Sequence, residues 1–192
     1  ARAPHVLERL SEDVAEVDED GYAVKKVTIP THISTHLDAP KHMVSGGKSL
    51  EEFPTRKFVG KAVVVDVRGQ DEISVDLDNV GVTQDVDMVF FRTGHVRNLH
   101  DDYFGSHPVV TEETAEQLVD RGVDIFGVDA NSPDKELFRV HDILLSNDVL
   151  IAENLTNLDD APDGRFDCYA LPLKIDDTDG APCRAVGVAD PT

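Results

Sequence analysis

The chain has 192 residues and a mass of 21.0 kDa, which fits one domain of ordinary size. Its 18 Lys and Arg against 38 Asp and Glu give a formal net charge of −20. This charge argues against binding to nucleic acid or to an anionic membrane surface, because both depend on basic side chains. No apolar run of about 18 residues occurs, so no membrane span is predicted. We expect a single domain over residues 1–192.

The acidic excess does not indicate disorder, because 40% of the residues are hydrophobic and fall in spaced runs. An Asp-rich, Lys-poor surface is typical of proteins from salt-loving microbes, where salt screens the repulsion, although an ordinary acidic protein is the alternative. The only two cysteines, Cys168 and Cys183, suit free thiols in a reducing compartment. With no secretory signal recognised, a cytoplasmic protein is expected.

The predicted strands are short and rich in β-branched residues. Two of them are near-continuous apolar runs, KAVVVDV and VDMVFFR, which is the pattern of strands buried on both faces. The predicted strands are Tyr22–Ile29, Lys61–Val67, Val86–Arg92, Val123–Val128, Val149–Ala152, Tyr169–Ile175 and Ala185–Ala189.

Two helices are predicted between these strands. Thr111 is a suitable N-cap, with Glu112 and Glu113 in the first turn and Gly122 at the end. Its apolar stripe is Ala115, Leu118 and Val119. The second helix follows Pro133 and has its pattern at Leu137, Phe138, Val140, His141, Leu144 and Leu145. Alternating strands and helices favour an α/β domain with a mixed, partly parallel central sheet flanked by helices.

The segment THISTHLDAPKH, residues 31–42, gathers side chains that bind metals or move protons: His32, His36, Asp38 and His42. One helical turn would place the first two histidines on the same face, within reach of one ion, whereas an extended chain would separate them by about 13 Å. Pro30 and Pro40 bracket the segment and disfavour a long helix, so a loop with a short helical turn is expected. The alternative is that each His is a polar residue satisfied by local hydrogen bonds.

The motif HISTHLDAPKH resembles the signature H-x-G-T-H-x-D-x-P-x-H of the cyclase family of metal-dependent hydrolases, which includes bacterial kynurenine formamidase and isatin hydrolase. Further blocks resemble the family in the same order, and together they cover roughly residues 20 to 190. These blocks are GYAVKKVTI before the motif, Arg92-Thr93-Gly94, Val110–Asp134, His141–Leu145 with Glu153-Asn154-Leu155, Tyr169–Leu173 and Gly180–Arg184.

The resemblance implies a swivelling β/α/β fold and a site for two Zn²⁺ or Mn²⁺ ions per chain. One ion would be held by His32, His36 and Asp38, and the second by Asp38, His141 and Glu153, with Asp38 bridging. His42 would be the catalytic histidine. Taken alone, without the resemblance, His141 would be interpreted as a half-buried helix residue and Glu153 as a solvated strand end.

The implied reaction is hydrolysis of a formamide or cyclic amide C–N bond, as in tryptophan breakdown. Bound divalent ions would lower the pKa of water, and His42 would pass a proton to the leaving nitrogen. The alternatives are an isatin- or lactone-type hydrolase of the same family and a non-catalytic metal-binding scaffold, for which His42 would be unnecessary. The resemblance also implies a small-molecule substrate and a homodimer or homotetramer.

Three departures from the family pattern stand out. Ser34 replaces the glycine of the motif and would narrow the pocket floor or donate a hydrogen bond. The amino-terminal strand of the family is not recognised before Gly21. His95 follows the Arg92-Thr93-Gly94 block, where the family often has an aromatic residue, and is expected near the mouth of the site. The substrate is therefore not defined by the sequence.

Overall fold

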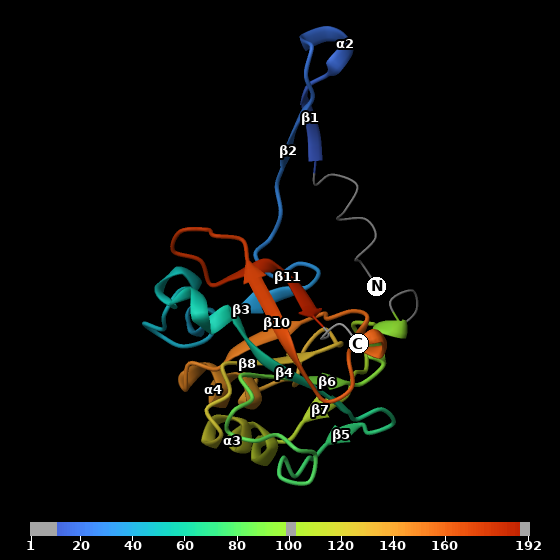
Figure 1. The fold of residues 1–192 in the computed structure, drawn as a ribbon. Helices are drawn as coiled ribbons and strands as arrows, with labels where there is room; N and C mark the ends of the chain where they lie inside the picture. The colour runs from blue at the N-terminus through green and yellow to red at the C-terminus, as the bar shows by residue number, and fades with distance from the viewer. Residues whose placement is uncertain (1–10, 99–102, 189–192) are drawn as a thin grey trace.

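The computed structural model describes residues 11–98 and 103–188 (Figure 1). None of the helices in this part of the chain is long and apolar enough to cross a membrane. The strands are β1 Ser11–Ala15, β2 Val24–Val27, β3 His36–Asp38, β4 Val59–Asp66, β5 Glu72–Ile73, β6 Met88–Arg92, β7 Val109–Val110, β8 Ile125–Val128, β9 Leu150–Glu153, β10 Arg165–Pro172 and β11 Gly180–Val188. The α-helices are α2 Val17–Asp20, α3 Glu112–Asp120 and α4 Arg139–Ser146.

Seven strands form a closed barrel in the order β10-β11-β3-β9-β8-β6-β4. The strands β4, β6, β8 and β9 are parallel neighbours, and β3, β10 and β11 complete the ring through antiparallel pairs. The predicted mixed α/β fold is confirmed. Closure of the sheet was not predicted; it removes the exposed edges that an open sheet would leave.

Alternation along the strands divides the core into two clusters. Met88 and Phe90 of β6 point into the barrel with Ala152 and Cys168, whereas Val89 and Phe91 point outward. The outward cluster packs against α3 and α4, which contribute Ala115, Leu118, Val140, Leu144 and Leu145. The helices therefore cover the outer face of the parallel half of the barrel.

The first predicted helix is confirmed at α3. Thr111 is its N-cap, and its side chain accepts a hydrogen bond from the Thr114 amide. Gly122 follows with φ of 72°, in the left-handed region that glycine enters without strain.

The second predicted helix begins later than its apolar pattern indicates. Leu137 and Phe138 have φ of 81° and 46°, so they precede α4 instead of forming its first turn. The reason is Asp134, whose carboxylate accepts hydrogen bonds from the Val140 and His141 amides and so fixes where the helix begins.

The predicted strand Tyr22–Ile29 is confirmed in its central part, but it is shorter than the sequence indicates. The structure has β2 over Val24–Val27, paired only with β1, and all four of its residues are exposed. These two strands form an arm that stands away from the barrel (Figure 1). The last predicted strand lies within β11 except for Ala189, which lies outside the described residues.

Candidate metal centre

The motif of residues 31–42 folds as a tight turn, a strand and a 3₁₀ helix. His36 and Asp38 lie on β3, not on the expected helical turn, and Pro40–His42 form the 3₁₀ helix. The chain turns at Ser34, whose φ is 55°, and this brings the His32 and His36 rings to 5.1 Å between centroids. A left-handed backbone at Ser34 thus achieves the close approach that we had expected from a helical turn.

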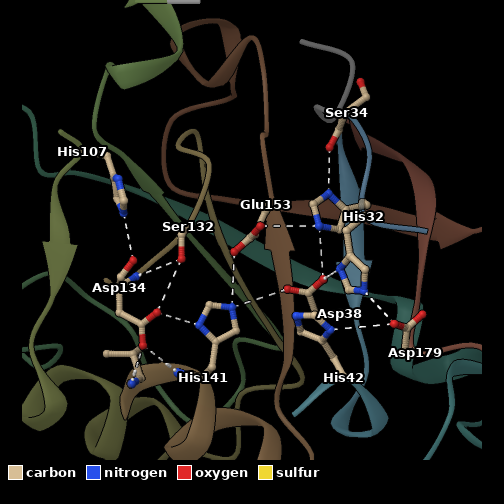
Figure 2. A network of polar contacts seen from close by, with 12 residues as sticks. His32, Ser34, Asp38, His42, His107, Ser132, Asp134, His141, Glu153 and Asp179 are labelled. Atoms are coloured by element: carbon tan, nitrogen blue, oxygen red, sulfur yellow. Dashed lines mark hydrogen bonds and ion pairs between the residues drawn. The ribbon is translucent and has the colours of Figure 1, made fainter. Parts of the chain in front are cut away.

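Pairing of β3 with β9 brings Glu153 close to the ligands predicted in residues 31–42. His36 pairs with Glu153 of β9 in register, and Asp38 pairs with Ile151. Since alternate residues share a face of a sheet, His36, Asp38 and Glu153 all point outward from the barrel, toward α4. His141 of α4 completes the cluster (Figure 2).

Asp38 lies at the centre of this cluster and is 1% exposed. Its Oδ1 accepts a hydrogen bond from His32 Nδ1 at 2.6 Å and lies 3.2 Å from His36 Nε2. Its Oδ2 lies 3.7 Å from His141 Nε2. Burial alone would raise the pKa of Asp38, but its contacts with these three imidazoles lower it well below its usual range. The two oxygens of one carboxylate therefore face two different sets of ligands.

The imidazoles of His36 and His141 are fixed through their Nδ1 atoms. The Nδ1 of His36 donates to the Ser34 carbonyl at 2.8 Å, and that of His141 donates to Asp134 Oδ1 at 2.7 Å. Each Nε2 is thereby directed at the carboxylates, and the Nε2 atoms lie 3.5 and 3.4 Å from oxygens of Glu153. Anchoring one ring nitrogen so that the other faces an ion is the usual arrangement of metal-binding histidines.

The charges and the unpaired atoms of the cluster fit a bound cation. Burial and the nearby Asp38 charge raise the pKa of Glu153, against the effect of His141. Burial lowers the pKa of His141, but Asp134, Asp38 and Glu153 outweigh it and raise the pKa to about 11. The buried Nε2 of His36 has no hydrogen-bond partner. A divalent ion would give His36 Nε2 a partner and would offset the repulsion between the Asp38 and Glu153 carboxylates. The residues therefore fit such an ion.

The cluster opens to solvent on the side of His42. Side-chain exposure rises from 3% at His36 and His141 to 23% at His32 and 28% at His42. The His42 ring lies 4.0 Å from that of His32, centroid to centroid, and Asp179 Oδ2 lies 3.8 Å from His42 Nδ1 (Figure 2). A small molecule reaching the buried carboxylates would therefore pass His42.

Every predicted ligand lies in this cluster, but the sequence analysis missed two carboxylates that support it. Asp134 holds His141 from seven residues upstream, and Asp179 contacts His32 Nε2 at 3.2 Å from the segment before β11. His42, Asp179 and His32 also place ligand atoms within 4.8 Å of one another. The only sequence signal for Asp179 was its place directly before the block Gly180–Arg184.

His95 does not reach the cluster. It is buried, and its Nε2 donates to the Tyr103 carbonyl at 2.8 Å, with the two rings stacked at 5.0 Å. Tyr103 in turn donates its hydroxyl hydrogen to Asn154, beside Glu153. His95 is thus linked, through Tyr103, to the residue that follows β9.

A cavity of about 560 Å³ is lined by residues of β10 and β11 and by the segment after β9, and none of the predicted ligands lines it. Its lining also includes Ser34 and Thr35. Ser34 therefore lies between this cavity and the cluster. Ser34 is exposed, and its carbonyl accepts the hydrogen bond from His36.

Comparison with known proteins assigns this site to a class. The fold matches the solved structure of a potential metal-dependent hydrolase with cyclase activity, with a TM-score of 0.76, 28% identity, and coverage of 94% of this chain and 87% of that one. Isatin hydrolase A from Labrenzia aggregata matches with a TM-score of 0.82 over 92% of this chain and 81% of that chain, at 24% identity. The fold and the cluster together are those of a metal-dependent hydrolase.

Sequence comparison identifies the family. The family model described as putative cyclase matches residues 4–135. A kynurenine formamidase from Erythrobacter litoralis is 35% identical over 166 residues, covering 85% of this chain and 76% of that protein. Another, from Salinibacter ruber, is 33% identical over 174 residues, covering 88% and 81%. The chain belongs to the cyclase family and is a hydrolase of that family.

Proposed function

We propose that this protein hydrolyses a formamide or cyclic amide C–N bond, with an N-formylated arylamine such as N-formylkynurenine as its substrate type. The relatives named kynurenine formamidase, at 33–35% identity, support this choice. The observation that carries the proposal is the position of Asp38, whose two oxygens face the His32–His36 pair and His141 separately. One carboxylate facing two ligand sets suits a pair of divalent ions.

The ions we propose are Zn²⁺ or Mn²⁺, because the ligand set combines imidazole with carboxylate and lacks thiolate. The ligands would be His32, His36, Asp38, His141 and Glu153. When bound, the metal supplies Lewis acidity and lowers the pKa of water. Asp134 and the Ser34 carbonyl keep His141 and His36 in the orientation that binding needs.

His42 is the residue proposed to move the proton. It lies at the open side of the cluster, so a substrate bound over the carboxylates would contact its ring. Its imidazole would carry a proton to the leaving nitrogen as the C–N bond breaks, and general acid catalysis of this kind contributes about 10²- to 10⁴-fold. Asp179, 3.8 Å from His42 Nδ1, limits the positions of the ring.

The test is turnover of N-formylkynurenine, isatin and simple lactones by the purified protein, stripped with chelator and then loaded with Zn²⁺ or Mn²⁺. We expect metal-dependent release of formate from N-formylkynurenine, and loss of this activity in Glu153→Gln. Preference for isatin or a lactone would change the proposed substrate, but the protein would still be a metal-dependent hydrolase. Metal binding without turnover of any of the three would favour the non-catalytic scaffold and overturn the proposal.

Two wider proposals accompany the activity. The free cysteines, Cys168 and Cys183, suit a reducing compartment, so we place the protein in the cytoplasm. We also propose that it works as a homo-oligomer with a small-molecule substrate and without nucleic acid or membrane partners.

A further inference from the structure

A further group of ligand atoms lies at the open side of the metal centre. His32, His42 and Asp179 each place one ligand atom there, and these atoms lie within 4.8 Å of one another. Asp179 Oδ2 is 3.2 Å from His32 Nε2 and 3.8 Å from His42 Nδ1, so both rings face the same carboxylate (Figure 2). We call His32, His42 and Asp179 the outer triad. The proposed pair of ions faces His32 through its other nitrogen, Nδ1.

The spacing within the outer triad suits three ligands of one ion. Zn²⁺ bonds nitrogen and oxygen at about 2.0–2.2 Å, so two ligand atoms at a tetrahedral angle lie about 3.3–3.6 Å apart. The two distances from Asp179 Oδ2 lie on either side of this range. The longer one, to His42 Nδ1, exceeds a hydrogen-bond length, so no hydrogen bond has to be broken when an ion enters between these two atoms.

The contact between His32 and Asp38 leaves His32 Nε2 available to the outer triad. His32 Nδ1 and Asp38 Oδ1 are 2.6 Å apart, which is a hydrogen-bond distance and is too short for two ligands of one tetrahedral ion. When Nδ1 donates its hydrogen to Asp38, the lone pair of a neutral His32 is on Nε2. His32 therefore serves the inner pair through Nδ1 or the outer triad through Nε2, and the pair keeps its other proposed ligands in both cases.

Backbone contacts hold Asp179 beside the two histidines. Its carbonyl accepts a hydrogen bond from the Ala39 amide at 2.9 Å, directly before the 3₁₀ helix that contains His42. Gly180 follows, and a Cβ at that position would lie 2.7 Å from His32 Cε1, so glycine permits the close approach of the His32 ring. The relative positions of the three side chains are therefore set by the fold of the chain around them.

The chemistry of the outer triad suits zinc better than manganese or magnesium. It offers two imidazoles and one carboxylate, and imidazole favours Zn²⁺, whereas Mn²⁺ and Mg²⁺ prefer oxygen ligands. All three side chains are partly exposed, so an ion can enter from solvent and a water can complete its coordination.

We propose that the outer triad binds a third divalent ion of the Zn²⁺ type and that this ion inhibits the enzyme by occupying His42. The third ion binds more weakly than the proposed pair, because the outer triad has a single carboxylate and is partly exposed to solvent. At two equivalents of metal the outer triad stays empty, and it fills only when zinc is in excess.

Inhibition follows from the two nitrogens of His42. An ion at Nδ1 takes the lone pair of that atom, so the ring hydrogen is on Nε2. The ring then has no free lone pair and cannot take up the proton that it has to pass to the leaving nitrogen. This effect rests on the proposed function, because it requires His42 to carry the proton, whereas the binding of the ion does not depend on it.

The first experiment counts the zinc ions bound to the full chain. Wild type, Asp179→Asn and His42→Gln are equilibrated with buffered free Zn²⁺, in KCl and excess Mg²⁺ that screen and occupy ordinary surface carboxylates. Asp177→Asn is the matched control, because Asp177 is two residues from Asp179 but its side chain is 82% exposed. We expect two tight ions in all four proteins, and a third, weaker ion only in wild type and Asp177→Asn.

The second experiment measures turnover of N-formylkynurenine by the zinc-loaded proteins. Excess Zn²⁺ should lower kcat of wild type and Asp177→Asn by about 10²-fold or more, as the loss of general acid catalysis does. Excess Mn²⁺ should not, because the imidazoles of the outer triad favour zinc. Asp179→Asn, whatever its own rate, should be insensitive to excess zinc.

Three results would overturn the proposal. A wild type that never binds more than two zinc ions would mean that the outer triad holds none. A third ion that remains in both Asp179→Asn and His42→Gln would lie elsewhere on the chain. A third ion that leaves turnover unchanged would not act on His42. Absence of turnover with any substrate would instead contradict the proposed function, and the ion count would still decide whether the outer triad binds a cation.

Discussion

Asp134 holds His141 through both of its carboxylate oxygens. Oδ1 accepts from His141 Nδ1 at 2.7 Å, and Oδ2 accepts from the amides of Val140 and His141 at 2.8 and 3.2 Å (Figure 2). One side chain therefore determines where α4 begins and which nitrogen of His141 faces Asp38. Asp134 is itself buried, and His107 donates to its backbone carbonyl at 2.9 Å.

The first prediction concerns Asp134→Asn. Loss of the carboxylate removes the charge that orients His141, so the affinity for Zn²⁺ or Mn²⁺ should fall about 10- to 100-fold. Competition with a chromogenic chelator measures this. Asp142→Asn is the matched control, because Asp142 lies beside His141 in the chain but its side chain is 63% exposed. Equal affinity in the two variants would contradict a supporting role for Asp134.

The second prediction is that metal affinity rises with pH. In the metal-free protein, Asp38 and other acceptors overcome burial and raise the pKa of His36, and the pKa of His141 is raised to about 11. Both imidazoles must lose a proton to bind an ion, so binding releases protons and strengthens between about pH 6 and pH 9. Calorimetric titrations in buffers of different ionisation enthalpy count those protons.

The same shift predicts how the metal-free protein responds to pH. A pKa raised above the unfolded value stabilises the fold below about 6.5, the unfolded pKa, and this stability is lost as the pH rises toward about 11. Melting temperatures of the stripped protein should therefore fall from about pH 7 to pH 9, whereas those of the loaded protein should not. A melting temperature of the stripped protein that does not fall over this range would contradict a raised pKa of His141.

The residues of the predicted site could be named from the sequence, because most of them stand close together in the chain. The histidines and Asp38 stand in one short motif, and the resemblance supplied His141 and Glu153. The backbone conformation of the motif could not be predicted from the sequence. It depends on one residue with a left-handed conformation, Ser34, and no hydrophobic pattern indicates such a conformation. The approach of His32 to His36 was therefore attributed to a helical turn.

The elements of the parallel half of the barrel were predicted well for a related reason. Strands such as β6 are buried on both faces, so their sequences are continuous apolar runs. The strand β2, with the sequence VKKV, is instead exposed along its whole length, and whether a short strand is covered depends on what packs against it. That is a property of the assembled molecule, which the local pattern does not contain, so the sequence predicted the strand but not its position in an arm.

The third prediction is that Ser34→Gly retains metal binding. The family motif has glycine here, and φ of 55° explains why, since glycine adopts this conformation without strain. His36 bonds to the backbone carbonyl of Ser34, which glycine keeps. We expect unchanged metal affinity and a change in unfolding free energy within about 1 kcal/mol, because relief of strain offsets the added freedom of the unfolded chain. Ser34→Val, which is disfavoured at this φ, should lower both.

The fourth prediction concerns salt. With a formal charge of −20, the fold is opposed by repulsion that reaches ~10 Å at about 0.1 M salt and only ~3 Å at about 1 M. The melting temperature should therefore rise with KCl over this range. A variant with several exposed acids replaced by their amides should gain less from salt. Melts that show no gain for the unmodified chain would contradict the expectation that this chain is adapted to high salt.

The last prediction separates proton transfer from metal binding at His42. Its ring lies at the open side of the cluster and is not needed for either set of proposed ligands. His42→Gln should therefore keep the metal content while kcat and kcat/KM fall together by about 10²- to 10⁴-fold. His36→Gln, which removes a proposed ligand, should lose metal and so serves as the contrast. Metal loss in His42→Gln would make His42 a ligand, in the group that it forms with His32 and Asp179. Full activity with full metal content in His42→Gln would mean that another residue transfers the proton to the leaving nitrogen.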